Sequence, residues 1–171
     1  MAFLKKHAEV DNFLVSLVMD HERYMPLVQI MDNIIDGAAE LSWKQLEVLG
    51  LEVSDAMGSH FCSGVRQGMI NALDAADGEA KNLEVLQAFA SKLTQNPSLV
   101  NQDDIEGIRS NGWSDQTIED VVGWVSVMKA YATLDQGLGF GGMPQEVFDE
   151  MGQGTVGSKG YVAIFNHFVN M

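Results

Sequence analysis

The sequence has little cysteine and few basic residues, and each scarcity excludes a class of protein. Its 171 residues include one cysteine, so the internal disulfide framework of a small secreted domain cannot form. Lysine and arginine number 10 against 24 aspartate and glutamate, which gives a formal net charge of −14. Such a charge repels phosphate backbones and anionic headgroups, so we expect neither nucleic acid nor a membrane as a partner.

Long apolar runs are also lacking. No stretch approaches the roughly 20 apolar residues that a transmembrane helix needs, and the run Phe13–Met19 is interrupted by Ser16 and followed by Asp20. The first residues do not have the pattern of a signal peptide. We therefore expect a cytoplasmic protein. The length and the 46% of hydrophobic residues fit a single domain over residues 1–171.

Strand-like alternation is nearly absent, and the apolar residues recur with helical spacing instead. Apolar stripes and capping residues predict one helix that ends at Gly37. They predict others over residues 42–57, 59–73, 83–95, 103–110, 114–134 and 144–151. Residues 74–79 are expected to form a polar connection, and the glycine-rich residues 137–142 and 152–160 are expected to form loops. An apolar segment, 161–169, follows. The sequence thus predicts an all-α fold of seven or eight helices.

Cys62 is the main candidate for chemistry. With Ser59 as the N-cap, Cys62 lies in the first turn of a helix, where the partial positive charge favours a thiolate. Arg66 lies one turn further along the same face, and His60 is a near neighbour in sequence. This arrangement predicts a Cys62 pKa below the usual thiol value of about 8.5. In the alternative interpretation, Cys62 is a small buried apolar side chain, Ser59 is only a cap, and Arg66 is a solvated charge.

Other patterns predict no cofactor and no metal. Residues 152–157 match GxGxxG, but no strand precedes them as a dinucleotide-binding unit requires, so we interpret them as a loop. The four histidines are scattered without the paired spacing of metal ligands.

The spacing around Cys62 is similar to a known family motif, in which Glu is followed after eleven residues by Cys-x-x-Cys and, three residues later, by His. Here the positions hold Glu47, Ser59, Cys62 and Arg66. Residues 86–94, 103–109 and 112–118 are also similar to that family. Over roughly residues 26–139 the sequence therefore resembles the alkylhydroperoxidase (AhpD-like) and carboxymuconolactone decarboxylase superfamily, especially its peroxidase-related branch.

The resemblance implies an all-helical fold that assembles into dimers, trimers or hexamers. In active members the second Cys attacks a hydroperoxide, the first Cys resolves the sulfenic acid, and Glu and His relay protons. Carried over, Cys62 would be the peroxidatic thiol and Glu47 part of the relay. Ser59 cannot form a disulfide, and Arg66 stays protonated at physiological pH, so it cannot exchange protons as His does.

Three functions stay open. The first is a one-cysteine thiol-dependent peroxidase or antioxidant, in which an external thiol reduces the Cys62 sulfenic acid and the site comprises Cys62, Glu47, Ser59, Arg66 and His60. The second is a catalytically degenerate member with a binding or structural role. The third is a carboxymuconolactone-decarboxylase-like enzyme in which Glu47 acts as a base on a small organic acid.

Apolar residues occur on more than one side of the helices expected over residues 42–73. Trp43, Val48, Leu51 and Phe61 add to the stripes that a monomer core needs. Obligate subunit interfaces are apolar in this way, so we expect a homo-oligomer with these residues at the interface.

Overall fold

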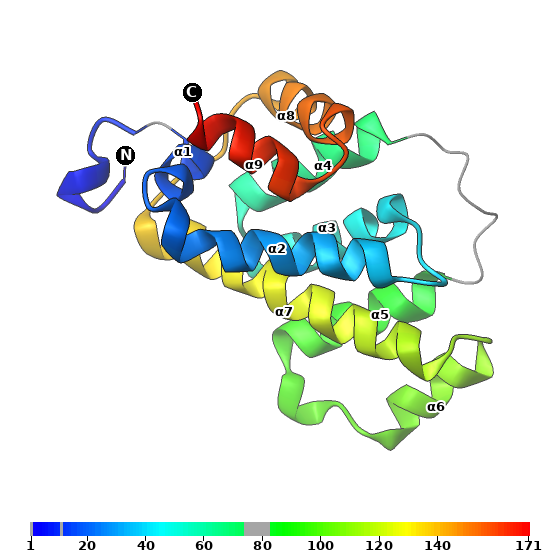
Figure 1. Cartoon of the computed structure of the whole chain (residues 1–171). Helices are drawn as coiled ribbons and strands as arrows, with labels where there is room; N and C mark the ends of the chain where they lie inside the picture. The colour runs from blue at the N-terminus through cyan, green and yellow to red at the C-terminus, as the bar shows by residue number, and fades with distance from the viewer. Residues whose placement is uncertain (1, 11, 74–82) are drawn as a thin grey trace.

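The chain is described from a computed structural model that covers residues 2–10, 12–73 and 83–171 (Figure 1). Within these ranges the chain is all-helical and has no strand, which confirms the predicted fold class. The helices are α1 (Phe13–Val18), α2 (His21–Gly37), α3 (Trp43–Met57), α4 (His60–Ala72), α5 (Leu83–Gln95), α6 (Gln102–Ser110), α7 (Asp115–Leu138), α8 (Gln145–Gly157) and α9 (Tyr161–Val169), with 3₁₀ turns η1 (Lys5–His7) and η2 (Pro97–Leu99). No helix among the described residues is long and apolar enough to cross a membrane.

The junction between α3 and α4 forms as the local sequence predicts. Ser42 and Gln45 make the reciprocal bonds of a capping box at the start of α3. Gly58 ends that helix in the left-handed region, with φ of 68°, where glycine has no steric penalty. Ser59 then caps α4, because its Oγ accepts a hydrogen bond from the backbone N–H of Cys62 at 3.2 Å.

The region after α7 differs from the prediction. Residues 152–157 belong to α8, so the expected loop there is wrong, and the helix expected to stop at residue 151 extends to Gly157. The reason is packing between α8 and α4. A Cβ added at Gly152 would lie 2.2 Å from the Gly68 carbonyl oxygen, and one added at Gly68 would lie 2.1 Å from the Phe148 carbonyl oxygen. Glycine here permits two helix backbones to approach each other; it does not break the helix.

Helix α7 is longer than the sequence predicts. Helix α7 runs beyond the expected residue 134 to Leu138, so Gly137 is helical, and Gly139 ends the helix with φ of 78°. The predicted polar connection at residues 74–79 lies outside the described residues.

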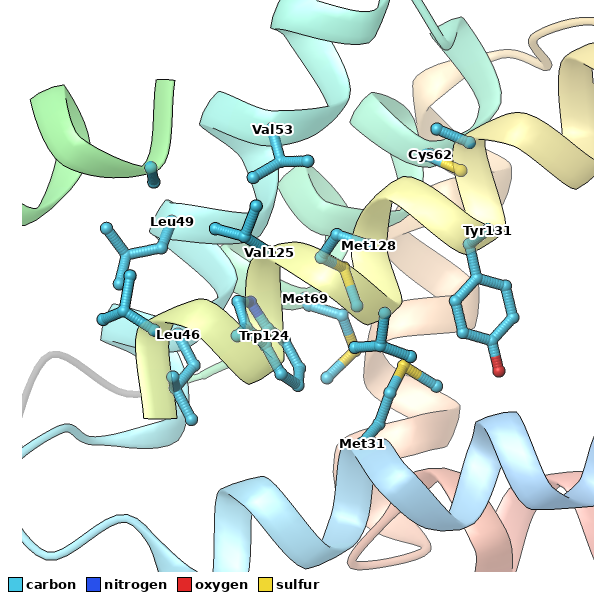
Figure 2. Close-up of a cluster of buried hydrophobic side chains, with 14 of the residues drawn as sticks. Met31, Leu46, Leu49, Val53, Cys62, Met69, Trp124, Val125, Met128 and Tyr131 are labelled. Atoms are coloured by element: carbon cyan, nitrogen blue, oxygen red, sulfur yellow. The ribbon is translucent and has the colours of Figure 1, made fainter. Parts of the chain in front are cut away.

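The core forms around α3, which packs against α4, α5 and α7 (Figures 1 and 2). Helix α8 covers α4, and α9 lies along α2. The side chains that fill the centre are fully or almost fully buried: Leu46, Leu49, Val53, Met69, Trp124 and Val125. This packing fixes the relative positions of α3 and α4, which carry Glu47, His60, Cys62 and Arg66, with Ser59 at the junction between them.

One of the four residues expected at a subunit interface is buried within the chain. Phe61 is 2% exposed and makes edge-to-face contacts with Phe13 of α1 and Phe148 of α8, with ring centroids 5.5 and 5.4 Å apart. The interface assignment is therefore wrong for Phe61, because α1 and α8 cover it. The other three residues are half-buried. Assembly into an oligomer stays a prediction.

Candidate functional site

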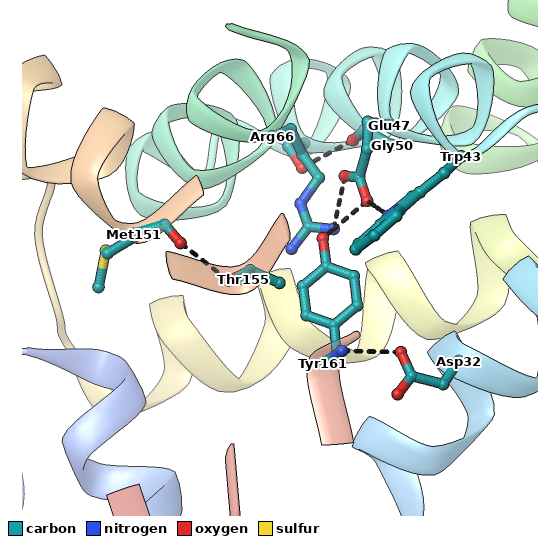
Figure 3. A network of polar contacts seen from close by, with 9 residues as sticks. Asp32, Trp43, Glu47, Gly50, Arg66, Met151, Thr155 and Tyr161 are labelled. Atoms are coloured by element: carbon teal, nitrogen blue, oxygen red, sulfur yellow. Dashed lines mark hydrogen bonds and ion pairs between the residues drawn. The ribbon is translucent and has the colours of Figure 1, made fainter. Parts of the chain in front are cut away.

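A buried polar network joins α3, α4 and α9 (Figure 3). The Glu47 carboxylate accepts a hydrogen bond from Arg66 Nη1 at Oε2, and from Trp43 Nε1 and the Tyr161 hydroxyl at Oε1, at 2.8, 2.8 and 2.7 Å. Arg66 Nη1 also donates to the Tyr161 hydroxyl oxygen at 2.8 Å. Trp43 and Glu47 are four residues apart, so helical geometry alone places them on one face of α3. Glu47 and Arg66 meet only because α3 and α4 pack together.

Asp32 of α2 positions Tyr161. Its two carboxylate oxygens each accept a backbone N–H at the start of α9, from Tyr161 and from Val162, both at 2.8 Å. A distant side chain thus satisfies donors that a local cap satisfies in other helices. Gly160 allows this approach, because its φ is 148° and a Cβ there would lie 2.9 Å from Asp32 Oδ2.

The Arg66 charge is held inside the protein. The residue is 7% exposed, so the interpretation of Arg66 as a solvated charge is wrong. Burial alone would lower its pKa, but the Glu47 carboxylate raises the Arg66 pKa above its usual value. The guanidinium carbon lies 5.2 Å from the Tyr161 ring centroid, which adds a cation–π contact. Glu47 and Arg66 therefore form a fixed charge pair.

Cys62 does not have the environment of an activated thiol. Its side chain is buried, and burial raises the pKa of the thiol to about 11, outweighing the Ser59 hydroxyl and the Arg66 charge, which lower it. The expected pKa below the usual thiol value is therefore wrong. The helix N-terminus is present as predicted, but the loss of hydration on burial has the largest effect on the thiol.

Ser59 links Cys62 to Asp135, whereas His60 lies elsewhere. The Ser59 hydroxyl donates to Asp135 Oδ2 of α7 at 2.7 Å while its oxygen caps α4. Burial raises the pKa of Asp135, and the Ser59 hydrogen bond partly offsets this. His60 is exposed and does not line the cavity described next, so it is separated from the sulfur.

A cavity of about 130 Å³ adjoins Cys62. Residues from six helices line it, and most of them are apolar. Examples are Phe13, Leu17, Val28, Met31, Val65, Met128, Met151 and Phe165. Polar side chains of the lining include those of Cys62, Arg66, Tyr131, Thr155 and Tyr161. The lining also includes Glu150 of α8 and Phe168 of α9, which are exposed, so the cavity reaches the protein surface. Glu47 is on the far side of Arg66 and is not part of the lining.

The structure thus pairs Glu47 with Arg66, places Cys62 and Arg66 on the wall of one cavity, joins Ser59 to Asp135, and leaves His60 outside that wall. Sequence reasoning missed Tyr131 and Tyr161. The segment containing Tyr161 was interpreted only as apolar, and Tyr131 lies at a helical core position three residues after Met128. A buried tyrosine carries a hydroxyl that needs a partner, and that is the signal that could have marked both residues. Among the described residues, no group of three His, Cys, Asp or Glu side chains could hold a metal ion.

No family model and no curated protein matches the chain. The fold is similar to the crystal structure of an uncharacterized peroxidase-related protein from Silicibacter sp. TM1040, with a TM-score of 0.69 and 18% sequence identity over 81% of this chain and 78% of the other. At that identity the similarity concerns the fold. The likeness to the peroxidase-related branch of the AhpD-like superfamily, and to its motif, rests on the sequence alone.

Proposed function

We propose that this protein is a binding member of the peroxidase-related fold, which takes up a small, mostly apolar molecule in the cavity beside Cys62. The observation that carries the proposal is the combination of a surface-connected apolar cavity with a thiol whose pKa is raised to about 11. At neutral pH such a thiol is almost entirely protonated, and the protonated form is a poor nucleophile.

The size and lining of the cavity indicate the size of the ligand. Its volume of about 130 Å³ is close to that of an engineered apolar cavity of about 150 Å³ that admits benzene. Burial of apolar ligand surface stabilises the complex by roughly 25 cal/mol per Å². A molecule with a single ring, or a short branched chain, fits these dimensions.

The geometry offers less support for proton-transfer catalysis. Both oxygens of Glu47 accept hydrogen bonds, and one of them is paired with Arg66. The carboxylate is fully buried and is not on the cavity wall. A base has to reach the proton that it removes, so Glu47 is poorly placed for the decarboxylase-like role.

A one-cysteine peroxidase is the second candidate, because Cys62 lines the cavity and a peroxide that enters would meet the sulfur. In that reaction the thiolate attacks one peroxide oxygen, the O–O bond breaks, and water or an alcohol leaves. Two equivalents of an external thiol would then reduce the Cys62 sulfenic acid back to the thiol and leave as a disulfide.

One set of measurements separates the candidates. Calorimetric titration with toluene is expected to show saturable 1:1 binding that is abolished in Val65→Phe and in Val28→Phe, two variants that each fill the cavity from a different helix. Mass spectrometry after one equivalent of hydrogen peroxide is expected to leave Cys62 unmodified. Absence of toluene binding to the folded wild type contradicts the binding proposal. Stoichiometric sulfenic acid at Cys62, with turnover supported by a dithiol, favours the peroxidase.

A further inference from the structure

Two buried polar groups, both in residues that line the cavity, make no hydrogen bond among the described residues. The first is Arg66 Nε, which is buried and makes no hydrogen bond among the described residues. In Figure 3, Nη1 faces Glu47 and Tyr161, and Met151 and Thr155 of α8 lie on the other side of the guanidinium. Both of those residues line the cavity.

The second is the hydroxyl of Tyr131 on α7. The side chain is 7% exposed, and its hydroxyl makes no hydrogen bond in the part of the chain that the structure describes. It shares the cavity wall with Cys62 and Arg66. Burial raises the pKa of Tyr131, so the phenol keeps its proton and is a donor at neutral pH. An unpaired buried donor costs about 1–3 kcal/mol, a cost that an acceptor in the cavity would remove.

The charge balance determines what kind of acceptor fits. The positive charge of Arg66 is already matched by Glu47, 2.8 Å away. A carboxylate ligand would add an unmatched negative charge in an apolar cavity, and the loss of its hydration is costly. An uncharged oxygen costs much less to bury than a carboxylate, and it can accept a hydrogen bond from either Nε–H or a phenol. A carbonyl oxygen, with two lone pairs, can accept both bonds.

We propose that the cavity selects small uncharged molecules of one-ring size that carry a carbonyl oxygen, which Tyr131 and Arg66 hold by hydrogen bonds. This specificity rests on the proposed binding function and adds the chemical class of the ligand. The apolar walls hold the ring, and the two donors orient the oxygen towards the side of the cavity that carries Arg66.

The test compares two probes of the same shape. Acetophenone carries the carbonyl oxygen, and α-methylstyrene has a CH₂ group in its place. Calorimetric titration is expected to give about tenfold tighter binding of acetophenone to the wild type, the effect of a hydrogen bond made in a buried site. In Tyr131→Phe this preference is expected to fall several-fold, while α-methylstyrene binding is unchanged. Benzoate is expected to bind more weakly than acetophenone.

A control variant and the thermal stability of Tyr131→Phe show whether a change in ligand preference comes from the lost hydroxyl. Tyr24→Phe removes the hydroxyl of a half-buried tyrosine that does not line the cavity, so it is expected to keep the wild-type preference. The unliganded Tyr131→Phe protein is expected to melt no lower than the wild type, because it loses an unpaired buried hydroxyl. Equal binding of the two isosteric probes, or tightest binding of benzoate, overturns the specificity but leaves the binding function. Binding of neither neutral probe rejects both.

Discussion

Arg66 and Glu47 form a buried ion pair, with Nη1 2.8 Å from Oε2 and side chains that are 8% and 0% exposed. The two residues stand where the family resemblance places a proton-relaying His and Glu. A permanent charge pair with additional bonds to Trp43 and Tyr161 has a different physical role from a relay. It joins α3, α4 and α9 to one another, and it leaves Arg66 on the wall of the cavity.

Removal of one partner of this pair is expected to be costly. Arg66→Met leaves the Glu47 carboxylate buried and uncompensated, so we expect the free energy of unfolding to fall by about 3–5 kcal/mol. In the double variant with Glu47→Gln, the amide oxygen still accepts from Trp43 and Tyr161 while the charge is gone. Urea denaturation is expected to show that the double variant is more stable than Arg66→Met alone. Strictly additive losses in this double-mutant cycle contradict the coupling.

The raised pKa of Cys62 predicts how stability depends on alkaline pH. The folded protein holds the thiol proton up to about pH 11, whereas the unfolded chain releases it near its ordinary value. The stabilisation from this thiol is therefore fully present below the unfolded-state pKa. Above that value we expect the free energy of unfolding to fall by about 1.4 kcal/mol per pH unit until the folded-state pKa is reached. Unfolding measured between pH 8 and 10.5 in the wild type and in Cys62→Ala isolates the effect, since both contain the same tyrosines. Parallel pH curves for the two proteins would show an ordinary thiol.

Asp135 is expected to be a source of instability at neutral pH. One carboxylate oxygen accepts from Ser59, and the other is buried without a hydrogen bond among the described residues. Because burial raises its pKa, the folded state favours the protonated form, and stability from this group is lost as the pH rises through the folded-state pKa. We expect Asp135→Asn to stabilise the protein by about 1 kcal/mol at pH 7, with a smaller gain at pH 3. Chemical denaturation at the two pH values measures this.

Substitution of Ser59 tests the N-cap of α4 and the hydrogen bond to Asp135 together. Ser59→Ala removes the N-cap of α4 and the donor to Asp135 together. It is expected to destabilise the protein by about 1–2 kcal/mol at pH 7. Urea denaturation of Ser59→Ala measures the loss, and unchanged stability would contradict a stabilising role for this hydroxyl.

The contact between α4 and α8 predicts opposite effects of two alanine substitutions on one helix. Gly152→Ala places a Cβ 2.2 Å from the backbone oxygen of Gly68, so the helices have to separate and we expect a loss of several kcal/mol in unfolding free energy. Gly154→Ala, on an exposed part of the same helix, meets only Ile164 at 3.9 Å and is expected to gain up to about 1 kcal/mol from helix propensity. Thermal unfolding of the pair checks the prediction, and a stabilised Gly152→Ala would contradict the close approach.

Local sequence was sufficient where a helix end depends on its own residues. The capping box of Ser42, the left-handed Gly58 and the N-cap Ser59 were all predicted and are confirmed, because each is decided by groups within a few residues. Glycine at position 152 was misleading. Its usual meaning in a helical pattern is a break, and only the nearby backbone of Gly68 explains why it lies inside α8.

The sequence by itself determined the all-α class and the spacing that places Cys62 and Arg66 one turn apart on one helix, because helical periodicity is a local property of the chain. Tertiary structure decided the chemistry of those residues. The same helix N-terminus and the same arginine predicted a reactive thiol, but the packing of α1, α7, α8 and α9 around α4 removed water from Cys62 and raised its pKa to about 11. Glu47 and Tyr161, which are distant in sequence, bind Nη1 of Arg66, and the buried Nε of this cavity-lining residue makes no hydrogen bond among the described residues. The hydration of a side chain and its hydrogen-bond partners depend on which helices pack against it, and the spacing of residues along the chain does not contain that information.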